Sequence, residues 1–253
     1  MNWIGLWTLT SREVGRFFKV YRQTVIPGLI SSVLYILIFG FTLEQRISSI
    51  EGISYTIFII PGLIMMNTLT NASSNPSSSL LQMKLTGQVP DLMQAPLSSL
   101  EISLAFIVGG VVRGVVNGIL ILLIGMWIGG MEVLYPIATI GFIFVVSVAF
   151  SSMCLLLGQM ADPWDQLATM QNFFLTPLSF LGGIFYSVNM LPDWAQTISA
   201  FNPIYYMING LRYTTLGFSD SDPQYSFVIA LLMSIGLSFI AIFSMKSGKK
   251  MKQ

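Results

Sequence analysis

Long apolar runs without charge constrain the fold of this chain more than any other feature. Of its 253 residues, 54% are hydrophobic and only 9% are charged, whereas soluble domains carry about 25% charged residues. About 20 apolar residues cross a bilayer as a helix. Inside a bilayer every backbone polar group needs a partner within the protein, which helices provide. The sequence therefore predicts an all-α integral membrane protein.

Six segments have the length and hydropathy of transmembrane helices. The predicted spans are Val25 to Leu43, Ile53 to about Asn71, Glu101 to about Ile128, Met131 to Gly158, Leu167 to Val188, and Tyr225 to Met245. Nine of the twelve Lys and Arg residues fall in segments on the side of the N-terminus, and two fall on the other side. Because cytoplasmic flanks are rich in Lys and Arg, both termini are predicted to be cytoplasmic.

The first 24 residues are predicted to form a helix in the membrane interface, not a span. Arg12, Arg16 and Lys19 have i, i+4, i+7 spacing and share one helical face. Trp3 and Trp7 are among the apolar residues interleaved with them. A basic face combined with aromatic rings is typical of an interfacial helix. The alternative is a solvated basic arm, which the aromatic content disfavours.

Two proline breaks follow the predicted fifth span. They lie at Leu191-Pro192 and Asn202-Pro203, with apolar sequence on either side. Proline removes a backbone donor and disrupts the preceding turn. Such backbone is tolerated at membrane depth only where protein or a water-filled cavity covers it. We therefore predict short re-entrant helices over residues 189–217 on the outer side, an arrangement that suits a transport pathway.

The segment between the second and third predicted spans is too polar and too rich in proline to cross a membrane. From Asn71 to Ser99, leucines such as Leu80, Leu81 and Leu85 alternate with polar side chains. This pattern predicts a cytoplasmic loop with a short amphipathic helix and a turn over Thr86 to Pro90. The alternative is a disordered loop.

The residue types needed for catalysis or cofactor binding are scarce. The chain has no His and one Cys, so a metal site is not expected. It has no GxxxxGK[ST] pattern to hold nucleotide phosphates. Asp162 and Asp165 resemble a carboxylate pair but are better explained as polar caps near a helix N-terminus. We expect no enzyme activity, no cofactor and no nucleic-acid partner.

Arg113 is the one charge that lies away from the ends of the predicted spans, and it has two interpretations. A charge within the membrane needs a partner or a wet cavity, so Arg113 is either a substrate or gate residue or a structural pin between helices. Gly109, Gly110 and Gly114 allow a neighbouring helix to approach closely, which favours the pin. Similarly, Asn67 and Asn71 of the second span either line a pathway or satisfy contacts between helices.

Five patches resemble the ABC-2 type permeases, the membrane subunits of ATP-binding cassette exporters. They are IIPGLIMMN at 59–67, APLSSLEI at 95–102, GGVVRG at 109–114, LTPLSFLGGIFYSV at 175–188 and NPIYYMINGLRY at 202–213. The last two patches are the most specific, because hydropathy alone does not require them. The likeness covers nearly the whole chain, as one membrane domain over residues 1–253, and is strongest to compact bacterial permeases for drugs, glycolipids and polysaccharides.

This resemblance implies a homodimer in the bacterial inner membrane with two copies of a separate ATPase subunit, which would bind ATP and Mg. The loop over residues 76–97 would couple the two proteins. Its coupling residues would be Leu80, Leu81, Lys84, Leu85, Gln88 and Asp91. The first, second and fifth spans would line the path, with Asn67, Asn71, Phe174 and Tyr186 as its candidate residues. The cargo would be an amphipathic drug, a lipid, or a glycolipid or polysaccharide.

Two other classes of protein fit the hydropathy pattern. One is a stand-alone channel or secondary carrier that ATP does not drive. Such a carrier usually has intramembrane acids or an internal repeat, and neither is evident here. The other is a membrane anchor that has no transport path.

Overall fold

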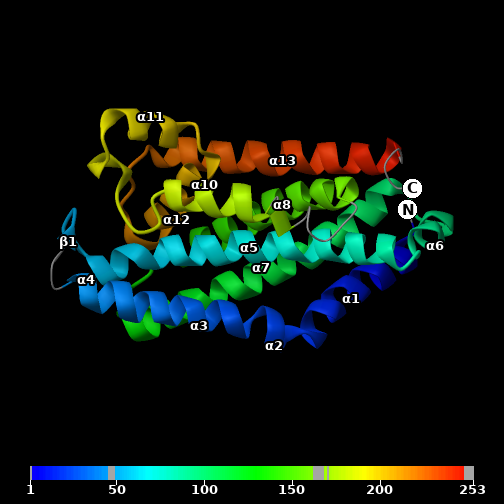
Figure 1. Cartoon of the computed structure of the whole chain (residues 1–253), viewed down its shortest axis with the longest axis horizontal. Coiled ribbons are helices and arrows are strands. Elements are labelled where there is room, and N and C mark those ends of the chain that lie inside the picture. Colours follow the sequence, from blue (N-terminus) through cyan, green and yellow to red (C-terminus); the bar gives the residue numbers. More distant parts are fainter. Residues whose placement is uncertain (1, 45–48, 162–167, 170, 248–253) are drawn as a thin grey trace.

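The computed structural model describes residues 2–44, 49–161, 168–169 and 171–247, and it consists largely of long helices side by side (Figure 1). The first helices are α1 Trp3–Lys19, α2 Tyr21–Thr24, α3 Ile26–Tyr35, the π-helical η1 Ile36–Phe41, α4 Thr42–Glu44, α5 Tyr55–Leu85, α6 Val89–Gln94 and α7 Ser99–Gly129. The later ones are α8 Pro136–Met160, η2 Gln171–Leu175, α10 Thr176–Leu181, η3 Val188–Met190, α11 Asp193–Ala200, α12 Pro203–Leu216 and α13 Pro223–Ser247. A two-stranded antiparallel hairpin, β1 Ser49–Ile50 and β2 Ile53–Ser54, pairs Ser49 with Ser54.

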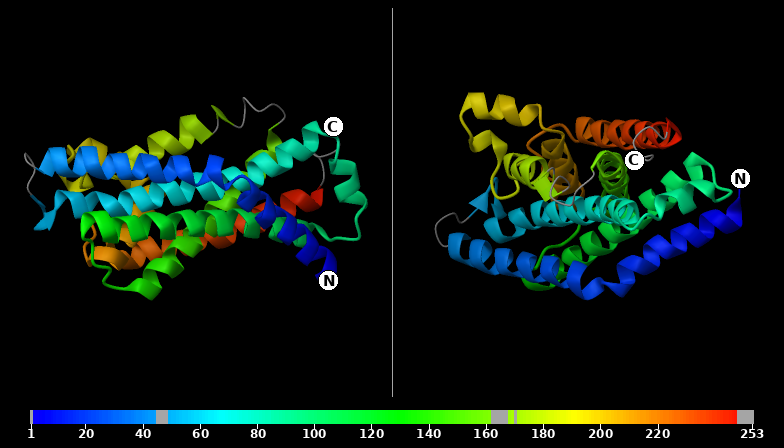
Figure 2. Two further views of the ribbon diagram at one scale, coloured as in Figure 1. Left: turned by 90° about the horizontal axis from the view of Figure 1, so that it is seen from below. Right: turned by 45° about the vertical axis from the view of Figure 1, so that its right-hand side comes forward.

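The bundle has two distinct ends. The start of α1, the end of α13 and helix α6 lie together at one end, here called the terminal end (Figures 1 and 2). The β-hairpin, α4 and α11 lie at the opposite end, here called the hairpin end (Figure 1). The predicted cytoplasmic segments and the predicted external segments therefore gather at opposite ends.

Five described helical segments are long and apolar enough to cross a membrane. They are Tyr21–Glu44, Tyr55–Leu85, Ser99–Gly129, Pro136–Met160 and Pro223–Ser247. These segments confirm the predicted all-α membrane fold and cover the predicted first, second, third, fourth and sixth spans. The predicted fifth span begins outside the described residues. Its described part is helical over Gln171–Leu181 and turns at Gly182 and Gly183 instead of continuing to Val188.

The predicted end of the second helix near Asn71 is wrong, because α5 continues to Leu85. Its serine hydroxyls donate back to carbonyls one turn earlier, as Ser74 Oγ does to Thr70 O at 2.6 Å and Ser78 Oγ to Ser74 O at 2.6 Å. Most of this polar stretch is buried in the bundle. Hydroxyls that donate to carbonyls of their own helix can stay in a helix interior. The polarity of this stretch was therefore not a sufficient reason to predict a loop. The predicted turn is present at Thr86 to Gln88, directly before α6.

The fourth long helix starts later than the predicted Met131. Helix α8 begins at Pro136, where proline is tolerated in the first turn. The preceding residues are held against the end of α12, because Leu134 N donates to Thr215 O at 2.9 Å and Tyr135 N to Thr214 O at 3.0 Å. These tertiary hydrogen bonds compete with the helix that hydropathy predicts.

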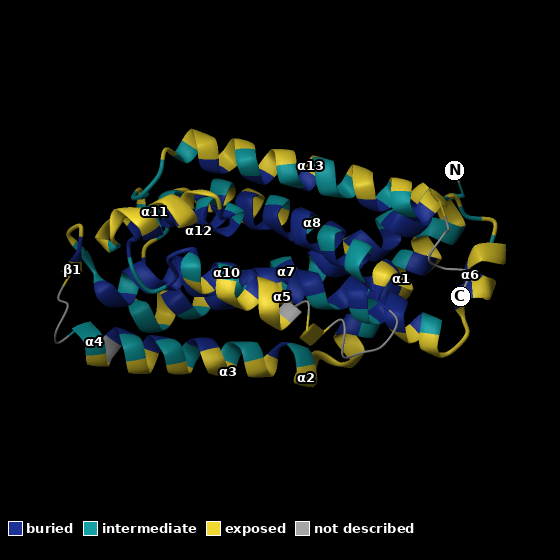
Figure 3. Ribbon diagram, turned by 45° about the horizontal axis from the view of Figure 1, so that its top comes forward, coloured by how far each residue is buried: buried dark blue, intermediate teal, exposed yellow. Residues whose placement is uncertain are grey.

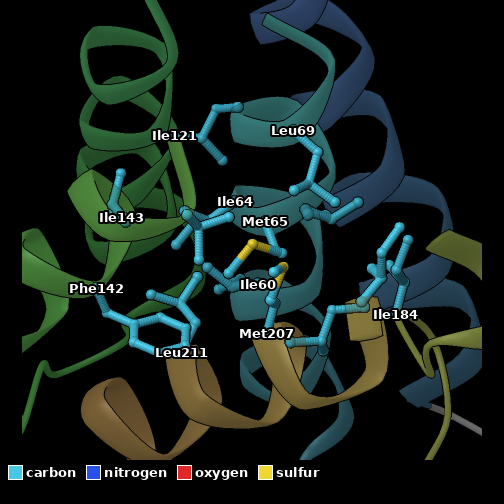
Figure 4. Close-up of a cluster of buried hydrophobic side chains, with 14 of the residues drawn as sticks. Ile60, Ile64, Met65, Leu69, Ile121, Phe142, Ile143, Ile184, Met207 and Leu211 are labelled. Atoms are coloured by element: carbon cyan, nitrogen blue, oxygen red, sulfur yellow. The ribbon is translucent and has the colours of Figure 1, made fainter. Parts of the chain in front are cut away.

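Helix α5 is the centre of the core. In the most apolar part of α5, 78% of the residues are buried, against 22% in the corresponding part of α13. Figure 3 shows that much of α13 is exposed. Figure 4 shows α5 side chains meeting residues of α7, α8 and α12. The labelled core residues are Ile60, Ile64, Met65, Leu69, Ile121, Phe142, Ile143, Ile184, Met207 and Leu211. Displacement of α5 would therefore affect most of the bundle.

The glycines of α7 allow the close helix contacts that the sequence predicts. A Cβ atom built at Gly114 would lie 2.8 Å from Ala72 Cβ of α5 and 2.7 Å from Ser147 Oγ of α8. A Cβ built at Gly109 would lie 2.8 Å from Glu13 Cβ of α1. Because these distances are shorter than side-chain contacts allow, glycine is needed where α7 meets its neighbours.

Helix α1 has an exposed aromatic face and an anchored face. Trp3 and Trp7 are exposed, as expected for a helix at a membrane surface. Glu13 and Phe17 are buried against the bundle. Arg16 Nη2 donates to Asn75 O of α5 at 2.7 Å, so one residue of the predicted basic face joins α1 to α5.

Both predicted proline breaks are confirmed as helix boundaries. Helix α11 begins directly after Pro192, and α12 begins at Pro203. Asn202 caps α12, since its Oδ1 accepts from Ile204 N at 3.0 Å, and its Nδ2 donates to Leu178 O of α10 at 2.6 Å. One side chain thus starts α12 and attaches it to α10.

Candidate functional site

A polar pocket of about 300 Å³ opens between α3, α5 and α7. We call it the α3–α5 pocket. Its polar side chains come from three helices and from α2. They are Gln23, Thr24, Ser31, Tyr35, Asn67, Thr70, Asn71 and Arg113. The site therefore brings together polar residues from helical segments that are apolar overall.

Four-residue spacing places these side chains on facing stripes. Ser31 and Tyr35 are four residues apart on α3, and Asn67 and Asn71 are four apart on α5, so each pair shares a helical face. Asn67 Nδ2 donates to Ser32 Oγ at 2.8 Å and joins the two helices. The contact is close, since a Cβ built at Gly28 would lie 2.7 Å from Asn67 Oδ1.

Arg113 enters the pocket from α7. Its Nε donates to Asn71 Oδ1 at 3.1 Å, which fits the predicted structural pin. Asn71 is oriented for this contact, because its Nδ2 donates to Asn67 O at 3.0 Å and leaves Oδ1 as the free acceptor. In the described part of the chain, no Asp or Glu lines the pocket and no carboxylate pairs with Arg113.

A second small pocket extends the polar surface of α5. It has a volume of about 60 Å³ and lies between α5 and the η2–α10 segment. Met66 and Thr70 line both this pocket and the α3–α5 pocket. Asn67, Thr70 and Asn71 therefore form a polar strip on the face of α5 between α3 and α10. Such a surface in a membrane bundle requires water or a protein partner beside it.

The structure brings together only some of the predicted pathway residues. Asn67 and Asn71 meet Arg113 in the α3–α5 pocket. Phe174 is 65% exposed and lines a separate, almost wholly apolar pocket of about 360 Å³ between α8, α10, α12 and α13. The Tyr186 hydroxyl donates to Phe180 O at 3.0 Å, and Tyr186 does not line the α3–α5 pocket.

Two of the predicted coupling residues are in the core. The alternation of Leu80 and Leu81 with polar residues predicted that they would be apolar anchors for a partner. Both are fully buried, so they cannot have that role in this structure. Lys84 Nζ donates to Gln159 O at 2.7 Å and to Ala161 O at 3.0 Å. The structure places Leu80 and Leu81 inward because α5 remains helical and turns this face toward α7 and α8.

The other predicted coupling residues include three that are exposed at the terminal end. Leu85, Gln88 and Asp91 are exposed, as a coupling surface requires. Met93 of α6 is also exposed, at 43%, and sequence reasoning did not single it out. The sequence held no clear signal for this exposure, because Met93 lies four residues after the buried Val89 and helical spacing places both on one side of α6.

The sequence analysis also did not identify a buried acid in α1, Glu13. Glu13 Oε1 accepts from Ser79 Oγ at 2.9 Å, and Arg16 lies 3.8 Å away. Burial is the main cause that raises the pKa of Glu13, and burial also lowers the pKa of Arg16. Arg16, Ser79 and Arg12 line a recess of about 200 Å³ at the terminal end.

Arg212, which the sequence analysis only counted among the charges on the outer side, is a buried structural residue. It is fully buried in α12 and lies 3.4 Å from the Asp220 carboxylate. Its Nη2 donates to Gly183 O at 2.8 Å, and its guanidinium lies 4.0 Å from the centre of the Phe58 ring. The partners are distant in sequence, so hydropathy and charge counting contained no signal for this cluster.

Comparison with known proteins agrees with this architecture. The family described as ABC-2 type transporter matches residues 5–216. Over 252 residues the chain is 34% identical to the Inner membrane transport permease YadH of Escherichia coli K12, covering 100% of this chain and 98% of that protein.

More distant relatives cover most of the chain. Nodulation protein J of Rhizobium leguminosarum bv. viciae is 24% identical over 220 residues, covering 86% of this chain and 83% of that protein. Nodulation protein J of Sinorhizobium fredii is 23% identical over 214 residues, covering 83% and 80%. The family match, the full-length similarity and the apolar helices together show that this chain is a membrane protein of the ABC-2 type transporter family.

Proposed function

We propose that this chain is the permease subunit of an ATP-binding cassette exporter in a bacterial inner membrane. The polar strip on α5, with the α3–α5 pocket at its edge, is the observation that carries the proposal. Polar groups and an arginine at this place are unfavourable against lipid and favourable beside a water-filled path. The full-length similarity to a protein named as an inner membrane transport permease supports the transport role.

The strip is proposed to face a second copy of the chain, so that two strips enclose one path. The chain crosses the bundle six times in this proposal. Helix α8 ends at the terminal end and α11 lies at the hairpin end, so the chain passes between the two ends after Met160 (Figure 1). Gln171–Leu181 belongs to that passage. Residues 189–217 form the external re-entrant region, and both termini are cytoplasmic.

Energy is proposed to enter from a separate ATPase subunit that binds ATP and Mg at the terminal end. Leu85 and Met93 are the exposed apolar anchors there, within the coupling region 76–97. The continuous α5 connects this surface to Asn71, about 21 Å away at 1.5 Å per residue. Because one helix includes both places, movement of the ATPase shifts the pathway residues directly. ATP then biases the equilibrium between inward-open and outward-open states.

The test replaces both anchors, Leu85→Asp and Met93→Asp, in one variant. Burying an apolar side chain of this size contributes about 1.5–3 kcal/mol, so the variant should lose at least about tenfold in capture of the ATPase subunit. Capture is scored by mass spectrometry of a copurified protein carrying a Walker A sequence. ATP-dependent export of a fluorescent amphipathic drug from cells is measured in parallel.

Leu134→Asp is the matched control. Leu134 is 55% exposed, as is Leu85, but it lies in the connection between α7 and α8 and contacts the end of α12. This variant should capture the ATPase subunit as the wild type does. Normal capture and export by the double variant would refute the coupling surface. Transport by the isolated chain without ATP would instead support a stand-alone carrier.

A further inference from the structure

The guanidinium of Arg113 is only partly satisfied by the protein. Nε donates to Asn71, and among the described residues no acceptor bonds the terminal nitrogens Nη1 and Nη2. Neither nitrogen is among the fully buried polar atoms that lack a partner. Since Arg113 lines the α3–α5 pocket, these two donors are accessible from it. The structural pin therefore uses one side of the guanidinium and leaves the other side open.

The pocket supplies no negative charge to balance this cation. Its described lining has amide, hydroxyl and apolar groups but no carboxylate. Glu13, which accepts from Ser79, and Asp220, which lies beside Arg212, are both outside the pocket lining. A partly buried cation inside a membrane bundle is unfavourable when it has no counter-charge. It therefore provides a strong attraction for an anion of suitable shape.

Pocket size and surroundings favour the head group of an amphipathic molecule. A volume of about 300 Å³ holds an oxyanion with part of its hydration shell. The hydroxyl of Tyr35 and the amide of Gln23 are further possible donors in the lining. The lipid-side face of α3 continues beside the pocket with the exposed Ile30 and Leu34. A polar head in the pocket would leave an apolar tail against this face.

We propose that the α3–α5 pocket binds the oxyanion head group of an amphipathic substrate, with Arg113 donating through Nη1 and Nη2 while Asn71 holds Nε. The inference rests on the proposed function and narrows the cargo to amphipathic anions. A planar guanidinium binds two oxygens of a phosphate or carboxylate through parallel hydrogen bonds. Asn71 is a positioning residue, because its Oδ1 sets the plane of the guanidinium.

The experiment measures binding of dodecyl phosphate to the purified chain in dodecyl maltoside by the shift in thermal unfolding temperature. The wild type should be stabilised by dodecyl phosphate and not by dodecyltrimethylammonium. Arg113→Gln should weaken the Kd at least about tenfold, because charge-assisted hydrogen bonds are lost. Arg113→Lys keeps the charge without the planar pair of donors and should fall between the two.

Lys19→Gln is the matched control, since it removes an exposed cation from α1 and leaves the pocket intact. Its Kd should equal that of the wild type. Equal affinity of Arg113→Gln and wild type would overturn the proposal, as would loss of binding only in Lys19→Gln. Inorganic phosphate that binds as tightly as dodecyl phosphate would overturn the amphipathic part, because the tail would then contribute nothing.

Folding and ATPase capture are checked on the same samples. Arg113→Gln should elute as the wild type does in size-exclusion chromatography and should still capture the ATPase subunit. If it misfolds, the Arg113→Lys titration decides the question, and an affinity equal to that of the wild type would count against bidentate binding. If the wild-type chain does not capture an ATPase subunit, the proposed function is refuted, and the measured affinity for dodecyl phosphate still stands.

Discussion

Replacing Asp220 by asparagine should destabilise the hairpin end strongly. Asp220→Asn keeps the shape of the side chain and removes the charge that lies 3.4 Å from Arg212. The guanidinium would remain fully buried in α12 without a counter-charge. Removing one partner of a buried pair is costly because the remaining charge is not compensated.

The expected cost follows from the distances. Two unit charges 3.4 Å apart interact by about 5 kcal/mol at an effective dielectric constant of about 20. Part of this is retained, because Gly183 O still accepts from Nη2 and the Phe58 ring still faces the cation. We expect a loss of about 3 kcal/mol, at the lower end of the range for broken buried pairs. For a chain of this size that corresponds to a fall of about 6–12 °C in Tm.

Arg212→Met should cost less than Asp220→Asn. The Asp220 carboxylate would still accept hydrogen bonds from Ser187 Oγ at 2.6 Å and from Val188 N at 3.2 Å. The arginine has no comparable second anion among the described residues. The double variant should recover part of the loss, because it buries neither charge alone.

The assay is equilibrium unfolding of the purified protein in mixed detergent micelles, arranged as a double-mutant cycle. We expect a coupling energy of about 2 kcal/mol or more between the two positions. Additive effects, or an Asp220→Asn variant within about 1 kcal/mol of the wild type, would refute the reasoning. In that case the hydrogen bonds to Gly183 and Asn209, and not the ion pair, would hold Arg212.

Two further predictions concern α1 and α7. Because burial raises the pKa of Glu13, the folded state binds this proton more tightly than the unfolded chain. Attachment of α1 should therefore weaken as pH rises from the ordinary glutamate value through the raised one. Glu13→Gln should abolish that dependence in hydrogen exchange of α1 between pH 5 and 8; an unchanged profile would show that another group titrates. Gly114→Ala should destabilise by about 1–3 kcal/mol, because its Cβ would overlap Ala72 and Ser147. Gly141→Ala, with open space around it, should be neutral or stabilising by up to about 1 kcal/mol in the same unfolding assay, and equal effects at both sites would contradict the close contact.

Several features of the fold were predictable because they depend on local chemistry. Long apolar runs with few or no charges identified α3, α7 and α13, since lipid demands such runs wherever a helix crosses it. Pro192 and Pro203 marked the starts of α11 and α12, because proline restricts its own backbone and that of the residue before it. Gly114 indicated a close helix contact for an equally local reason, the absence of Cβ.

The candidate site was predictable only in part. Asn67, Asn71 and Arg113 were recognisable as polar groups in apolar helices, which are unfavourable unless something surrounds them. Their meeting in one pocket depends on how α3, α5 and α7 pack. Phe174 was predicted to line the pathway, yet it lines an apolar pocket on another side of the bundle.

Tertiary structure alone decided which polar residues are buried. Composition and the order of apolar and polar segments were enough to predict a helical membrane protein, because transfer from water to lipid acts on each segment separately, and specific sequence patches pointed to the family. The continuation of α5 to Leu85, the burial of Leu80 and the pairing of Arg212 with Asp220 depend on neighbours that are distant along the chain. Whether a polar or apolar group is stable in a helix depends on the partners that packing supplies, and a linear sequence does not state those partners.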